Sequence, residues 1–263
     1  MKRFALLGSN LANSLSPKMY AFFSKKSGIP LIYETVELNE NATDQEILDV
    51  IKQYDGVNVT IPFKFRVGKL LGKNTPKNTV INSPEGDITS YSTDGEGVLA
   101  ALDYYGIEVT GKHLLILGAG GAAYSATKSL LSVDAELTVV DRHKKKAKNL
   151  MKELNIASPV TKVNGILSFI PLKNKLFYVS KRDISKCDFV FDCLYSSETE
   201  LLKTARKYQK TAINGLSMLF FQGVLNFYLF TGYRFTNTKL LFEEFYEYSY
   251  NQRAEFKLTG KKG

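Results

Sequence analysis

The sequence has few of the residues that build disulfide frameworks or metal centres. It contains only two cysteines and two histidines among 263 residues. Cys187 and Cys193 cannot form a disulfide framework, which fits a reducing compartment. His113 and His143 do not pair with a Cys or Glu at the spacing of metal ligands, which argues against a zinc site and a histidine-based catalytic triad. We therefore predict that the protein binds no metal.

Long apolar runs are also absent. No stretch reaches the roughly 18 consecutive uncharged apolar residues of a membrane-spanning helix. The apolar run Phe4–Leu7 is too short for a secretion signal, and Gly8–Asn10 reads as a turn after a first strand. These features predict a cytoplasmic protein with no membrane partner.

Positive charge is in excess, with a net charge of +9. Nucleic-acid binding would require the lysines and arginines to gather on one stripe, but they are scattered, and the groups at Lys144–Lys146 and Lys261–Lys262 are short. A solvated basic surface accounts for most of the charge, and a phosphorylated or acidic small molecule for the remainder. We predict no nucleic-acid partner.

A buried-strand pattern followed by glycines organises the chain. Leu114–Leu117 is a run of four apolar residues, typical of a strand in a parallel sheet. Gly118, Gly120 and Ala123 then fit the spacing G-x-G-x-x-G/A, and a helix pattern follows. The first glycine permits a tight turn, the second lets the backbone approach a pyrophosphate, and the alanine allows close helix packing. The helix N-terminus offers unpaired N–H groups to phosphates.

A second strand, Glu136–Val140, ends at Asp141, about 20 residues after the glycines, where a ribose contact is expected. These features predict a dinucleotide-binding unit. The chain length suits two α/β domains. We assign residues 1–98, completed by helices in 224–263, to a substrate-binding catalytic domain. Residues 99–223 are assigned to a Rossmann-type, doubly wound parallel sheet, with a cleft between the domains and C-terminal helices that return to the first.

Polar residues follow two of the predicted strands of the first domain. Ser16 before Pro17 has the pattern of a helix N-cap, but capping does not explain Ser14, so both hydroxyls are also candidates for a ligand. Asn58 and Thr60 share one face of a strand over residues 57–61 that we expect to be half-buried.

Three further polar residues allow two interpretations each. Lys64 follows the strand and is either an ordinary surface lysine or a site residue. Asp94 is either an N-cap or catalytic. Gln222 interrupts an apolar helix over residues 219–230 and is either hydrogen-bonded in the core or directed at a ligand.

Together these residues resemble the shikimate dehydrogenase family over nearly the whole chain. The resemblance rests on these motifs: Ser14-Leu15-Ser16-Pro17, Asn58-Val59-Thr60-Ile61-Pro62-Phe63-Lys64, Asn78-Thr79, Thr93-Asp94-Gly95, Gly118-Ala119-Gly120-Gly121-Ala122, Tyr195, Asn214-Gly215-Leu216-Ser217-Met218-Leu219 and Gln222-Gly223. It implies an enzyme that interconverts 3-dehydroshikimate and shikimate with NADP, as a monomer or homodimer.

The resemblance also implies roles for individual residues. Lys64 and Asp94 are the implied catalytic pair. The implied substrate contacts are Ser14, Ser16, Asn58, Thr60, Asn78, Tyr195 and Gln222. The implied cofactor contacts are Gly118, Ala119, Gly120, Gly121, Ala122, Asp141, Arg142, Gly215 and Met218.

The sequence departs from the family pattern in ways that leave alternatives open. Ser92 stands where the family has Asn, and the family's Asn-Ala-Thr-Pro loop has no clear counterpart between Asn164 and Asp192. Asp141 favours the free ribose diol of NAD, whereas Arg142 attracts the 2′-phosphate of NADP. A quinate or shikimate dehydrogenase that uses NAD is therefore an alternative, as is a non-catalytic sensor of nucleotides or metabolites.

Overall fold

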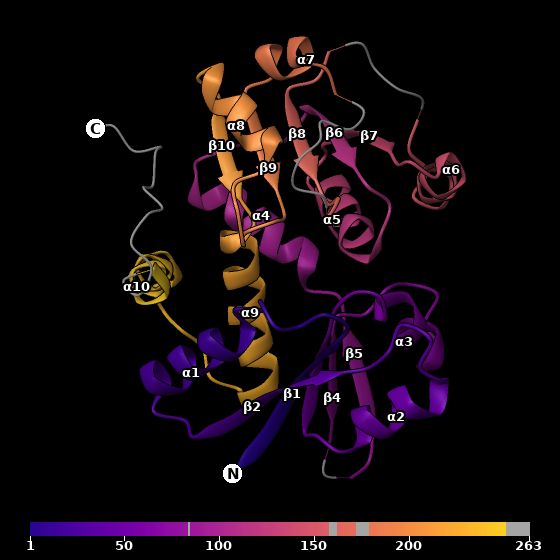
Figure 1. Cartoon of the computed structure of the whole chain (residues 1–263), viewed down its shortest axis with the longest axis vertical. Coiled ribbons are helices and arrows are strands. Elements are labelled where there is room, and N and C mark those ends of the chain that lie inside the picture. The colour runs from indigo at the N-terminus through magenta and orange to yellow at the C-terminus, as the bar shows by residue number, and fades with distance from the viewer. Residues whose placement is uncertain (84, 158–161, 172–178, 251–263) are drawn as a thin grey trace. The chain divides into compact units, whose positions relative to one another are not determined.

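The computed structural model describes residues 1–83, 85–157, 162–171 and 179–250, which form two compact α/β units (Figure 1). The first contains Met1–Gly97 and the described chain from Leu219 onward, and the second contains Val98–Met218. The boundaries therefore fall after residues 97 and 218, where the sequence placed them after 98 and 223. None of the described helices is long and apolar enough to cross a membrane.

The first unit is built on a mixed five-stranded sheet with the order β2-β1-β3-β4-β5. β1 is parallel to β2 and β3, and the hairpin of β4 and β5 extends the sheet in antiparallel pairing. Its strands are β1 (Lys2–Gly8), β2 (Leu31–Glu37), β3 (Gly56–Val59), β4 (Thr79–Asn82) and β5 (Ile88–Tyr91).

Apolar side chains on both faces of this sheet are covered by helices. Val57, Val59 and Phe63 pack in a core with residues of α2 and α3. On the other face, the ring of Phe230 stacks on Phe4 with the ring centroids 4.4 Å apart. The helices of this unit are α1 (Ser16–Ser27), α2 (Asp44–Lys52), α3 (Lys64–Leu70), the start of α4 (Asp94–Tyr104), most of α9 (Leu216–Thr231) and α10 (Thr238–Tyr250).

The second unit has a five-stranded, fully parallel sheet with the order β10-β9-β8-β6-β7. Its elements are β6 (His113–Leu117), α5 (Gly121–Leu131), β7 (Glu136–Val140), α6 (Lys144–Glu153), β8 (Gly165–Ser168), α7 (Lys181–Lys186), β9 (Phe189–Asp192), α8 (Glu200–Lys207) and β10 (Thr211–Asn214). The chain reverses its winding direction between β6 and β8. In such sheets, ligands bind beyond the carboxyl ends of the strands at this switch point. The predicted doubly wound sheet is confirmed.

Several local predictions need correction. Ser16 is the first residue of α1 and not its N-cap, which is Leu15. β3 is buried along its whole length because helices cover both faces of the sheet, and Ile61, expected inside, is 58% exposed. β8 lies in a segment from which no strand was predicted. The helices predicted within residues 224–263 are described as far as Tyr250, and the rest of that range lies outside the described residues.

Candidate active site

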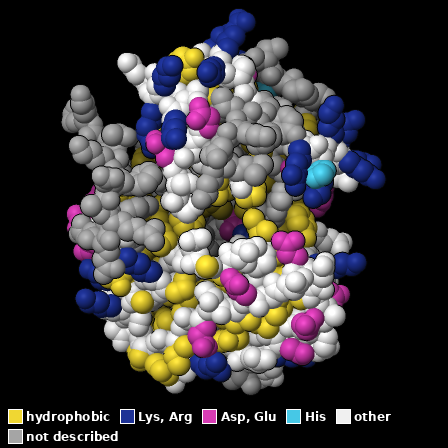
Figure 2. Space-filling view, viewed as in Figure 1, with side chains coloured by type: hydrophobic (Ala, Val, Ile, Leu, Met, Phe, Trp, Pro, Cys, Tyr) yellow, Lys and Arg dark blue, Asp and Glu magenta, His cyan; other side chains and the backbone are white. Residues whose placement is uncertain are grey.

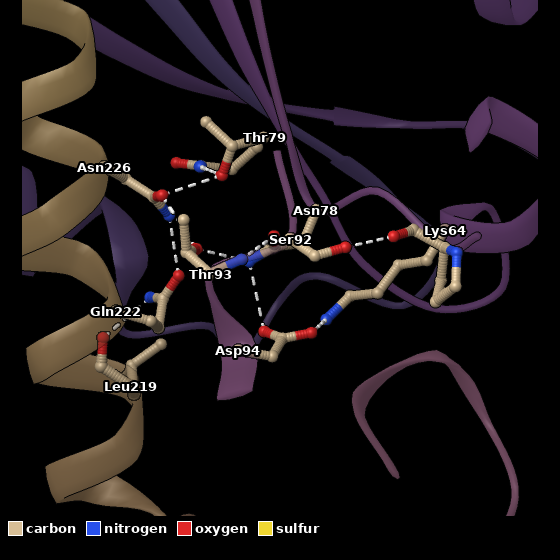
Figure 3. Close-up of polar contacts among 11 residues, drawn as sticks. Lys64, Asn78, Thr79, Ser92, Thr93, Asp94, Leu219, Gln222 and Asn226 are labelled. Atoms are coloured by element: carbon tan, nitrogen blue, oxygen red, sulfur yellow. Dashed lines mark hydrogen bonds and ion pairs between the residues drawn. The ribbon is translucent and has the colours of Figure 1, made fainter. Parts of the chain in front are cut away.

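A lysine–aspartate ion pair stands among the polar residues of the first unit. Lys64 is the first residue of α3, and Asp94 is the first residue of α4. Lys64 Nζ lies 2.5 Å from Asp94 Oδ2, and the two side chains are 13% and 7% exposed. Because the pair is largely shielded from water, the carboxylate attracts the ammonium strongly and fixes its direction. The structure thus brings together the two predicted catalytic residues (Figure 3).

Asn78 holds the Asp94 carboxylate from the other side. Its Nδ2 donates to Asp94 Oδ1 at 3.1 Å and to Thr93 Oγ1 at 2.8 Å. Its Oδ1 accepts the backbone N–H of Thr93 at 2.7 Å. The antiparallel pairing of β4 and β5 brings Asn78, just before β4, beside Thr93, just after β5. Each oxygen of the Asp94 carboxylate therefore has a donor, which leaves the carboxylate one orientation.

Gln222 projects from α9 and is partly exposed. Its Nε2 donates to the Leu219 carbonyl at 2.7 Å, and its Oε1 accepts from Asn226 Nδ2 at 2.7 Å. One hydrogen on Nε2 stays available for a ligand. Asn226 itself is completely buried and was missed as a site residue. The signal that could have found it is a second amide, one helical turn after Gln222, in an apolar helix.

The hydroxyl groups of three predicted substrate contacts, Ser14, Ser16 and Thr60, lie near the end of β1. Ser14 Oγ accepts the backbone N–H of Ser16 at 3.2 Å, so Ser14 helps to start α1. The backbone N–H of Thr60 bonds to the carbonyl of Leu7, which places Thr60 beside the same strand. Among the described residues, none forms a hydrogen bond with the hydroxyls of Ser16 and Thr60. Both hydroxyls are therefore free to bind a ligand.

The side-chain amide of Asn58 is hydrogen-bonded to other residues of the first unit. Its Oδ1 accepts from the hydroxyls of Tyr20 and Tyr33, both at 2.8 Å, and its Nδ2 donates to Thr79 Oγ1 at 3.3 Å. Burial raises the pKa of Tyr20 well above its usual range, so Tyr20 keeps the proton that it donates. These contacts make Asn58 a support for the site and leave only the second hydrogen of Nδ2 for a substrate.

The glycine loop of the second unit connects β6 to α5. Gly118 has φ of +105°, a conformation that favours glycine. A Cβ on Gly120 would meet no atom within 4 Å, so its backbone faces open space. Gly121 and Ala122 form the first turn of α5, which has no side-chain cap. The N–H groups of that turn are therefore available for the phosphates of a dinucleotide.

Asp141 ties this loop to the end of β7. Its Oδ2 accepts the backbone N–H of Ala119 at 2.9 Å, and its Oδ1 accepts that of His143 at 2.7 Å. Arg142 and the lysines 144–146 are exposed, and Figure 2 has a group of positive side chains where Figure 1 places α6. An acid that organises the loop and a basic group that follows it are compatible with a 2′-phosphate.

The three remaining predicted contacts belong to the second unit. Tyr195 is partly exposed in the loop after β9, and Met218 is 7% exposed in the first turn of α9. Gly215 has a packing role, because a Cβ there would lie 1.8 Å from the backbone oxygen of Cys193.

Comparisons with known proteins give a matching family for each of the two units. Residues 6–83 match a family described as the shikimate dehydrogenase substrate binding domain, and residues 106–214 match one described as putative NAD(P)-binding. A shikimate dehydrogenase (NADP(+)) of Carboxydothermus hydrogenoformans is 31% identical over 258 residues, covering 88% of this chain and 92% of that protein. One from Pyrococcus abyssi is also 31% identical, over 251 residues, with 88% and 93% covered.

Solved structures show the same likeness. Shikimate 5-dehydrogenase of Thermus thermophilus in complex with shikimate has a TM-score of 0.79 and 28% identity, with 92% of this chain and 97% of that chain covered. Its structure with NADP(H) and shikimate gives a TM-score of 0.77 and 27% identity, with 94% and 100% covered.

Proposed function

The chain belongs to the shikimate dehydrogenase family, and from this premise we infer that it catalyses the reversible, NADP-dependent reduction of 3-dehydroshikimate to shikimate. The observation that carries the inference is the shielded Lys64–Asp94 pair, held by Asn78. Proton transfer to a ring oxygen needs such a pair, whereas a protein that only binds its ligand does not need one.

The residues of the first unit suit both ends of such a substrate. The hydroxyls of Ser14, Ser16 and Thr60 hold the ring carboxylate. Gln222, Asn78 and the catalytic pair contact the oxygens of the ring. Because a wrong ligand would leave these polar groups unpaired, the contacts also select the substrate. Tyr195 is proposed as a further substrate contact, and Asn58 supports the site through its tyrosine partners.

Lys64 and Asp94 carry the proton chemistry. When bound, NADPH supplies the hydride that reduces the ring ketone. The Lys64 ammonium donates a hydrogen bond to the ketone oxygen, stabilises the negative charge that develops there, and delivers the proton. Asp94 orients the ammonium through the ion pair. In the oxidation direction the step runs in reverse, and the neutral Lys64 amine takes the proton from the hydroxyl and becomes the ammonium.

The cofactor is held by the second unit. The N–H groups of Gly120, Gly121 and Ala122 hold the pyrophosphate, and Arg142 pairs with the 2′-phosphate. Gly118 and Ala119 shape the loop, because their own N–H groups bond to the carbonyl of Val140 and the carboxylate of Asp141. Asp141 acts through its hydrogen bond to Ala119, which accounts for an acid at this position without a contact to a ribose diol. Gly215 and Met218 border the nicotinamide. We propose a cytoplasmic location, which the low number of cysteines supports, and a monomer or homodimer.

Replacement of Lys64 tests the assignment. We expect Lys64→Ala to lower kcat by about 10²- to 10⁴-fold, the usual contribution of a positioned proton donor. The dissociation constant for NADP should stay unchanged, because the glycine loop belongs to the other unit. Lys69→Ala is the matched control, since Lys69 is exposed on the same helix. Near-normal turnover of Lys64→Ala would reject the role of Lys64.

The wild-type protein decides among the three functions. We expect shikimate-dependent reduction of NADP, followed by absorbance, with a strong preference over NAD and no oxidation of quinate. Equal or better kcat/KM with NAD and quinate would favour the alternative. No turnover with either polyol and either cofactor would favour a sensor.

A further inference from the structure

Asn226 links two hydrogen-bonded arms of the proposed site. One arm is Gln222, and the other runs through Thr93 and Asn78 to Asp94. It lies on α9, has no exposed surface, and sits one helical turn beyond Gln222. Its Oδ1 accepts from the hydroxyls of Thr79 and Thr93, each at 2.8 Å. Its Nδ2 donates to Gln222 Oε1 at 2.7 Å. One buried amide therefore joins α9 to the ends of β4 and β5 (Figure 3).

The direction of each hydrogen bond on the Gln222 side follows from a fixed backbone group. The Leu219 carbonyl can only accept, so Gln222 must turn its Nε2 toward it. Gln222 Oε1 then faces Asn226, which must present its Nδ2. The oxygen of Asn226 is thereby directed at the two threonines, whose hydroxyls both donate to it.

The same assignment of donors and acceptors continues from Asn226 to the carboxylate of Asp94. Because the Thr93 hydroxyl gives its proton to Asn226, it is free to accept from Asn78 Nδ2. The Thr93 backbone N–H can only donate, so it independently fixes the oxygen side of Asn78. Asn78 must then direct its Nδ2 at Asp94. The chain of donors is consistent from the Leu219 carbonyl to the Lys64 ammonium.

We propose that Asn226 is a positioning residue that sets the orientation of Gln222 for substrate binding and, through the Thr93 hydroxyl, reinforces the orientation of Asn78 and Asp94 for proton transfer. The inference rests on the proposed function. An asparagine is needed because the position must accept two hydroxyl hydrogens on one side and donate to a carbonyl on the other. An apolar residue of similar size offers neither, which frees Gln222 to rotate and leaves the Thr93 hydroxyl without its acceptor.

The test compares Asn226→Leu with Asn82→Leu. Asn82 is also in the first unit, but within the described part of the chain its Nδ2 donates only to the carbonyls of Ile51 and Tyr54, outside the site. Both variants should lower the melting temperature. Only Asn226→Leu should raise the KM for shikimate, by about tenfold, and lower kcat several-fold, as the loss of buried hydrogen bonds predicts. The KM for NADP should stay unchanged.

A double-mutant cycle separates the two arms. In a Gln222→Leu background, Asn226→Leu should cause no further rise in the KM for shikimate but should still lower kcat, because the arm through Thr93 and Asn78 is intact until Asn226 is replaced. If Asn226→Leu does not fold, Asn226→Ala is measured in the same way.

Unchanged KM and kcat in a folded Asn226 variant would overturn the inference, as would additive KM effects in the cycle. Absence of shikimate turnover in the wild-type protein would instead reject the proposed function, so the two failures are distinguishable.

Discussion

At the scale of single residues, Asp192 is a buried carboxylate outside the proposed chemistry. Burial raises its pKa to about 6, partly offset by hydrogen bonds from Leu194 and Thr199. The folded protein therefore favours the protonated form. This contribution to stability is complete below the ordinary pKa of an aspartate, near 3.8, and is lost as pH rises through about 6. At neutral pH the ionised, buried carboxylate therefore lowers the free energy of unfolding.

Replacement of Asp192 should therefore stabilise the protein in a pH-dependent way. We expect Asp192→Asn to gain little at pH 4 and about 2–3 kcal/mol in free energy of unfolding at pH 8. Denaturant unfolding across this range measures the difference. Asp188→Asn, at an exposed position just before the same strand, is the control and should show no such trend. A gain that does not change with pH would contradict the argument.

Sequence patterns identify the residues that we propose to face a ligand more readily than the residue that we propose to position them. Lys64 and Asp94 begin helices, Asn78 immediately precedes a strand, and all three belong to motifs, so local sequence identifies them. Asn226 belongs to no motif, and its partners Thr79 and Thr93 lie far away in sequence. Only the packing of α9 on the hairpin of β4 and β5 brings them together, and no local pattern encodes that contact.

At the scale of elements, two glycines of the second unit have different roles, one in packing and one in cofactor binding. A Cβ on Gly215, between β10 and α9, would overlap the backbone of Cys193, which cannot move aside as a flexible side chain can. We expect Gly215→Ala to lower the free energy of unfolding by about 1–3 kcal/mol or more, as overpacking does. Gly120→Ala has room and should keep its stability, but it should raise the KM for NADP. Thermal unfolding and steady-state kinetics give the two readouts, and equal stability of both variants would contradict this distinction.

The strands that were misjudged share a physical cause. β8 has only four residues, all buried, so it lacks the alternation of polar and apolar residues that identifies a strand. β3 was recognised, but its polar Asn58 suggested one solvent-facing side. In fact Asn58 is buried because its amide is satisfied by Tyr20, Tyr33 and Thr79. Burial on both faces comes from helices distant in sequence.

At the scale of the whole molecule, the two compact units divide the proposed work. Described residues proposed for proton transfer and for most substrate contacts belong to the first unit, and the glycine loop and the basic group after β7 belong to the second. Substitutions should therefore separate substrate from cofactor parameters. The net charge of +9 also fits this division, because a cofactor with a 2′-phosphate and a substrate with a carboxylate are both anionic.

Arg142 provides the sharpest test of cofactor choice. It is exposed, and within the described residues no ion pair engages it, so its charge is available for a 2′-phosphate. Because NAD lacks that phosphate, Arg142→Ala should lower kcat/KM for NADP by about tenfold or more and leave that for NAD unchanged. The KM for shikimate should not move, since the substrate contacts lie mainly in the other unit. Lys148→Ala, on the exposed part of α6, is the matched control. Equal losses with both cofactors would instead place Arg142 against a group that NAD and NADP share, such as the pyrophosphate.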